Sequence, residues 1–168
     1  MSWRSIAGRS IWWKNKKSPF HEIGNFPIEL TKDGLEDDNI KHFGKQAIVG
    51  HWHSDMPGLT DTAKVLAASK GCPRQIIKYS EKHYGFQCHL EFTKALTELL
   101  IDSDKTLEQD SQTLPFVQSP QTIRSNSYDK MNNLLYEFLY KLIKNKINIL
   151  KSVKFRLKYF LNLVFKIF

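Results

Sequence analysis

The chain has little cysteine and no long apolar run, and each absence excludes some classes of protein. Its two cysteines, Cys72 and Cys88, permit at most one disulfide and form no Cys-x-x-Cys pair. A secreted disulfide framework and a zinc ribbon are therefore excluded, and a reducing, cytoplasmic setting is expected. The first 17 residues have basic residues on both sides of a short apolar stretch but no small-residue cleavage site, so no signal peptide is predicted.

Acidic residues are missing from one end of the sequence. The 168 residues carry a net charge of +8, and the stretch from Lys141 to Phe168 has eight basic residues and no acidic one. The excess charge therefore belongs mainly to a tail. No nucleic-acid recognition motif accompanies it, so a nucleic-acid partner is not expected. The longest uncharged run of this tail, Tyr159 to Phe165, is far shorter than the ~18 residues of a membrane-spanning helix.

The apolar content, at 41% with 12% aromatic residues, is sufficient for one modest core. Short apolar runs bounded by Pro, Gly and polar residues predict strands over 26–30, 46–53, 74–79 and 83–88, with Pro27 at an edge or a start. A 3.6-residue stripe that ends at Leu100 predicts a helix after them. A short helix between residues 2 and 13 and a loop with a helical turn over 32–45 are also expected. Strands that lead into a helix indicate an α/β fold.

Composition divides the chain into three parts. Residues 1–101 contain the predicted strands and the helix that follows them. Residues 102–130 are rich in Ser, Gln, Asp, Thr and Pro, which predicts a polar linker. Residues 131–168 predict a basic amphipathic helical tail that packs poorly against residues 20–101. This tail consists mostly of Leu, Ile, Phe, Tyr, Asn and Lys, which are the residues that AT-rich codons encode. The competing interpretation is therefore a tail that has no selected role.

The segment Tyr84-Gly-Phe-Gln-Cys-His-Leu-Glu-Phe92 carries the strongest chemical signal. Residues two apart share a face of an extended segment, so His89 and Glu91 are expected side by side at the end of a strand. Cys88 is expected on the opposite face. A histidine held by a carboxylate is suited to general-base catalysis, although the same spacing also occurs by chance in ordinary strands.

This segment resembles the Gly-x-Gln-Phe-His-Pro-Glu motif of class I glutamine amidotransferases, with Leu90 where the family has Pro and Cys88 where it has Phe. Three more segments resemble the family in the same order: His21–Ile28, similar to stand-alone members related to the glutaminase part of GMP synthase; His51–Asp55, similar to a wall of the glutamine pocket; and Ala67–Pro73. The resemblance covers about half of the chain.

The resemblance implies a flavodoxin-like α/β sandwich around a mostly parallel sheet, here incomplete and limited to its C-terminal half, with the helical tail added. It also implies hydrolysis of the glutamine side-chain amide and transfer of the ammonia, without a cofactor. In the family a cysteine thiolate attacks the amide. The histidine at the position of His89 shuttles the proton, and the glutamate at the position of Glu91 orients it. His53 and Asp55 correspond to the substrate pocket.

The family's nucleophile motif, Gly-x-Cys-x-Gly, does not occur in the sequence. In the family, backbone N–H groups of this motif form the oxyanion hole. Cys72 is followed by Pro73, which has no N–H, and Cys88 is expected to face away from His89. Both cysteines are therefore expected to be buried structural thiols. We expect the nucleophile to lie in an upstream half, which could complement the chain in trans, and the chain to be inactive alone.

Two rival interpretations stand beside this one. The residues His51, His53, Cys88 and His89 include metal-ligating types, but the sequence fixes no complete ligand set and a pocket wall explains the His-x-His pair equally well, so no metal site is predicted. The other interpretation is a non-enzymatic basic protein whose tail binds an anionic membrane surface or a partner.

Overall fold

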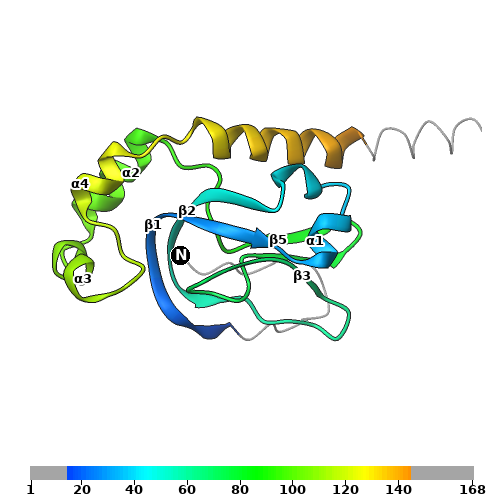
Figure 1. The fold of residues 1–168 in the computed structure, drawn as a ribbon, viewed down its shortest axis with the longest axis horizontal. Helices are drawn as coiled ribbons and strands as arrows, with labels where there is room; N and C mark the ends of the chain where they lie inside the picture. The colour runs from blue at the N-terminus through cyan, green and yellow to red at the C-terminus, as the bar shows by residue number, and fades with distance from the viewer. Residues whose placement is uncertain (1–14, 145–168) are drawn as a thin grey trace, which may run out of the picture.

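The computed structural model describes residues 15–144, and one curled five-stranded sheet forms its centre (Figure 1). The strands are β1 (Lys16–Leu30), β2 (Gln46–Met56), β3 (Lys64–Ser69), β4 (Ile76–Ser80) and β5 (His83–Phe86). Their order across the sheet is β2-β1-β3-β4-β5. Each of the four predicted strands overlaps an observed one. The helix predicted between residues 2 and 13 and the tail beyond residue 144 lie outside the described residues.

All four strand pairs of this sheet are antiparallel. The expectation of a mostly parallel sheet is therefore wrong for the described part of the chain. Short connections explain the difference, since a tight turn such as Glu81–Lys82 between β4 and β5 joins only antiparallel neighbours, whereas a parallel pair needs a longer crossover. A register shift between Lys17 and Glu22 accompanies the bend of β1, which curves along its length in Figure 1.

Strand β1 lies inside the sheet, although Pro27 predicted an edge or a strand start. Pro27 is opposite Ile48 of β2, and β3 pairs only with the last three residues of β1, from Ile28 to Leu30. Pro27 itself has no partner in β3, so the N–H that proline lacks is not needed for a hydrogen bond to that strand.

Short helices connect and cover the strands. The loop predicted over 32–45 contains α1 (Lys32–Glu36) and the 3₁₀ helix η1 (Lys41–Phe43), and the predicted leucine stripe forms α2 (Lys94–Ser103). Side-chain oxygens of Thr31 and Thr93 accept hydrogen bonds from the first turns of α1 and α2, so each helix begins directly after a capping residue. Two more helices follow, α3 (Leu107–Thr113) and α4 (Pro120–Ser125), and they gather with α2 at the left of Figure 1.

The segment predicted to be a polar linker carries a second small core. Its buried members are Ile23, Ile101, Leu107, Val117 and Ile123. The N–H of Ile23 donates to the Phe116 carbonyl at 2.9 Å, and the N–H of Gln118 donates to the Ile23 carbonyl at the same distance. The structure differs from the expected linker because four apolar residues of this segment are buried, which composition does not reveal: Leu107, Val117, Ile123 and Tyr128.

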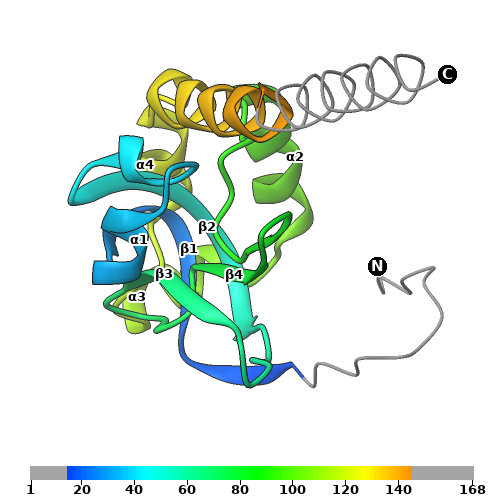
Figure 2. The ribbon, with the colours of Figure 1, turned by 90° about the vertical axis from the view of Figure 1, so that its right-hand side faces the viewer.

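A helix over residues 129–144 runs along one side of the sheet, at the top of Figures 1 and 2. Met131 and Phe138 of this helix are 1% and 4% exposed and belong to the main core. The Phe138 ring meets Tyr84 and Phe86 edge-on, with ring centroids 5.2 and 5.0 Å apart. As far as residue 144, the expected poor packing is therefore wrong. Within the described residues, no helix has the length and apolar character needed to span a membrane.

Candidate functional site

His89 lies just beyond β5, and the backbone of β2 fixes its position. Its N–H donates to the Gly50 carbonyl at 2.7 Å, and the Gly50 N–H donates to the His89 carbonyl at 3.0 Å. The imidazole ring stacks on Phe92, with ring centroids 4.6 Å apart and planes inclined by 9°. A Cβ at position 50 would lie 2.5 Å from the Phe92 ring, so this close pairing requires glycine.

Nδ1 of His89 lies 2.6 Å from Oε1 of Glu91. The expected side-by-side geometry is thus confirmed. Partial burial acts to raise the pKa of Glu91, but the hydrogen bond and charge of His89 outweigh it, so the pKa lies below its ordinary value. When Nδ1–H donates to the ionised Glu91, Nε2 keeps its lone pair and can accept a proton. The two side chains are 33% and 54% exposed, so the pair is open to a ligand.

Both cysteines are free and buried, as the sequence predicted. Cys88 is 3% exposed and belongs to the main core, whereas the neighbouring His89 side chain reaches the surface. Burial raises the pKa of the Cys72 and Cys88 thiols, so neither thiolate forms readily.

The two residues predicted to line the glutamine pocket, His53 and Asp55, lie at the end of β2. The Asp55 side chain is half-exposed and its Oδ1 lies 3.0 Å from Nζ of Lys17. His53 is buried, and burial together with the charge of His89 lowers its pKa to about 4. His53 is therefore neutral at physiological pH. The role of both residues in substrate binding stays a prediction.

Sequence reasoning missed a group of buried polar side chains around Glu22. Ser69 Oγ donates to Oε1 of Glu22, and Gln75 Nε2 donates to Oε2, both at 2.7 Å. Nε2 of His53 lies 3.4 Å from the same Oε2 and 3.3 Å from Nδ1 of His51. Burial raises the pKa of Glu22 despite these hydrogen bonds, and it lowers the pKa of His51 to about 3. The pairing of β1 with β2 sets Glu22 opposite His53 and so brings the group together. No local sequence pattern predicts this arrangement.

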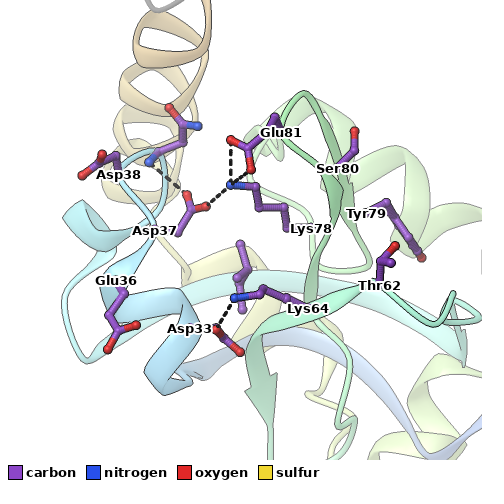
Figure 3. Close-up of a pocket in the computed structure, with 12 residues that line it drawn as sticks. Asp33, Glu36, Asp37, Asp38, Thr62, Lys64, Lys78, Tyr79, Ser80 and Glu81 are labelled. Carbon is purple, nitrogen blue, oxygen red and sulfur yellow. Dashed lines mark hydrogen bonds and ion pairs between the residues drawn. The ribbon is translucent and has the colours of Figure 1, made fainter.

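A separate polar hollow of about 440 Å³ lies between α1 and the turn that follows β4 (Figure 3). Lys78 Nζ donates to Oδ2 of Asp37 at 3.0 Å and also reaches Glu81. Lys64 Nζ donates to Oδ1 of Asp33 at 2.8 Å. Opposite charges pair across this hollow. We therefore interpret its lining residues as an ion-pair network that joins α1 to the sheet.

Comparison with known proteins finds relatives in sequence and in fold. No protein-family model matches the chain. The glutamine amidotransferase-like protein YfeJ of Salmonella typhimurium is 50% identical over 123 residues, which are 73% of this chain and 52% of YfeJ. The crystal structure of SMU.1228c superposes with a TM-score of 0.77 at 48% identity, over 79% of this chain and 56% of that one. A glutamine amidotransferase from Thermotoga maritima shares the fold, with a TM-score of 0.64 at 19% identity over 79% of this chain and 55% of that one.

The chain therefore resembles class I glutamine amidotransferases in both sequence and fold, as the motifs predicted. Its sequence relatives include YfeJ and SMU.1228c. It spans about half the length of each of these relatives.

Proposed function

We propose that the chain is the part of a glutamine amidotransferase that holds the general base and the carboxylate that orients it. The 2.6 Å contact between His89 Nδ1 and Glu91 Oε1 supports this most strongly. In the proposed reaction His89 Nε2 takes the proton of a cysteine thiol, the thiolate attacks the side-chain amide of glutamine, and the proton passes to the leaving ammonia. Water then hydrolyses the thioester to glutamate. His53 and Asp55 line the glutamine pocket in this proposal.

A complementing half supplies the nucleophile and the oxyanion hole in this proposal. The 168 residues contain no Gly-x-Cys-x-Gly segment, and both of their cysteines are buried. The relatives are about twice as long, which supports a site shared with a further segment. Without the thiolate His89 has nothing to activate, and loss of an oxyanion donor alone costs about 3 kcal/mol of transition-state stabilisation. The isolated chain is accordingly inactive.

Ammonia release from glutamine tests both parts of the proposal. The samples are the purified chain, the chain mixed with the part of YfeJ that the alignment leaves uncovered, and the same mixture with His89→Ala. We expect release from the unmodified mixture alone. Release by the isolated chain that His89→Ala abolishes would overturn the assignment of the nucleophile. A mixture that forms a complex by size-exclusion chromatography yet releases no ammonia would reject the proposal as a whole.

A second candidate function is binding to an anionic membrane surface through the C-terminal region. The outer face of the helix over 129–144 exposes Tyr136, Tyr140 and Ile143, and Nζ of Lys144 lies 5.8 Å from the centre of the Tyr140 ring. Basic residues interleaved with apolar ones favour such surfaces. Liposome sedimentation should compare the full chain with a chain that ends at residue 144, because an earlier end would remove core residues. Equal sedimentation of the two would exclude the tail as the anchor.

A further inference from the structure

Three side chains of metal-ligating types meet in the interior. Glu22 of β1, His53 of β2 and Cys72 of the turn between β3 and β4 each present one ligand atom, and these atoms lie within 4.8 Å of one another. The three residues are 0%, 8% and 0% exposed. Gly71 brings the turn against Glu22, since a Cβ there would lie 2.6 Å from the carboxyl group.

The donors and acceptors around this cluster do not all find hydrogen-bond partners in one another. Gln75 Nε2 lies 2.7 Å from Glu22 Oε2, 2.9 Å from Ser69 Oγ and 3.3 Å from His53 Nε2, but it has only two hydrogens. Its amide oxygen, Oε1, is buried and has no hydrogen-bond partner among the described residues. Buried polar atoms are rarely left in this state, because each unpaired atom costs free energy.

A cation would give the amide oxygen a partner. A half-turn of the Gln75 amide gives up the Nε2 hydrogen bonds to Glu22 and Ser69 and places Oε1 beside Glu22 and His53, where an oxygen is tolerated only if a positive charge lies between the groups. A carboxylate, an imidazole, a thiolate and an amide oxygen form a mixed set that suits a borderline-soft ion with four ligands better than Mg²⁺ or Ca²⁺.

We propose that Glu22, His53 and Cys72 bind one divalent transition-metal ion of the Zn²⁺ type, with Oε1 of Gln75 as the fourth ligand. The ion replaces the thiol proton of Cys72, which passes to the solvent, so affinity rises with pH. The site is closed, and its role is structural, because it ties β1 and β2 to the turn after β3. It shares His53 with the proposed glutamine pocket, but it does not depend on the function proposed for His89.

Cobalt binding to the full chain tests this site, since Co²⁺ reports a thiolate ligand by a near-ultraviolet charge-transfer absorption. We expect about one Co²⁺ per chain, displaced by Zn²⁺, and a higher melting temperature with either ion. Cys72→Ser should abolish the absorption, whereas Cys88→Ser should retain it. The two variants are matched, because both cysteines are buried and only Cys72 belongs to the cluster.

Glu22→Gln is a second variant that keeps the size of the side chain. It should weaken Co²⁺ binding by at least ~10-fold while circular dichroism shows an unchanged fold. A folded wild-type chain that binds no stoichiometric Co²⁺ would overturn the proposal and identify the cluster as a hydrogen-bonded network. An absorption that persists in Cys72→Ser, or disappears in Cys88→Ser, would overturn the assigned ligands.

Discussion

His89 and Gly50 exchange two backbone hydrogen bonds, of 2.7 and 3.0 Å, across the gap between the end of β5 and the middle of β2. The backbone of β2 thereby sets the place of the proposed base, while Glu91 sets the orientation of its ring. Position and orientation thus depend on different residues, and they can be tested separately.

Glu91→Gln should lower kcat for ammonia release by the reconstituted mixture about 100-fold, with little change in KM. The neutral amide cannot stabilise the imidazolium that forms when His89 accepts the thiol proton. Steady-state kinetics provide the measurement. Glu81→Gln, at a glutamate that is 90% exposed, is the control and should leave kcat unchanged. Equal losses in the two variants would remove Glu91 from the mechanism.

Gly50→Ala should destabilise the chain by about 1–3 kcal/mol, because the added methyl group meets the Phe92 ring at 2.5 Å. Urea unfolding measures this loss. The double variant with Phe92→Leu should recover part of it, since a smaller side chain gives way to the new methyl group. Additive losses from the two substitutions would contradict the predicted clash.

Phe138→Ala should cost about 3–5 kcal/mol of unfolding free energy, since this ring fills the space beside Tyr84 and Phe86. Tyr140→Ala, on the exposed face of the same helix, should change stability by less than about 0.5 kcal/mol. Similar small effects of both variants in chemical denaturation would show that the helix does not belong to the core.

Stability should fall as the pH rises above about 10.5, and Lys78 should account for part of the fall. Burial acts to lower the pKa of Lys78, but the hydrogen bond and charge of Asp37 outweigh it, so the pKa lies above its ordinary value of 10.5. A raised folded-state pKa gives stabilisation that is complete below the unfolded pKa and is lost as pH rises through the folded one.

Denaturation midpoints between pH 9 and about 12 check this dependence. Lys78→Met should show a shallower decline than the wild type, with a difference of at most about 1.4 kcal/mol per pH unit. Burial also raises the pKa of Tyr84, which supplies a decline that remains in the variant. Lys82→Met, at an exposed position of the next turn, should keep the wild-type slope. Identical slopes in all three proteins would refute the assignment.

Local patterns predicted four of the five strands, α2 and the meeting of His89 with Glu91, because neighbours along the chain determine these features. The cluster around Glu22 escaped prediction, since Glu22 and Gln75 are 53 positions apart and meet only after β1 and β4 have joined the sheet. Val117 escaped for a similar reason. It ends a short run, Leu114 to Val117, that is too brief to show a period, and its place beside Ile23 follows from tertiary structure.

The helix over 129–144 also determines when the chain can fold during its synthesis. Met131 and Phe138 complete a core that otherwise comes from residues 28–92 and Tyr128, so the sheet has an open face until the ribosome has released this helix. Chains still attached to the ribosome expose apolar surface for that interval, and such surface is what chaperones bind and what leads to aggregation. The helix over 129–144 thus sets the moment at which the nascent chain covers this apolar face.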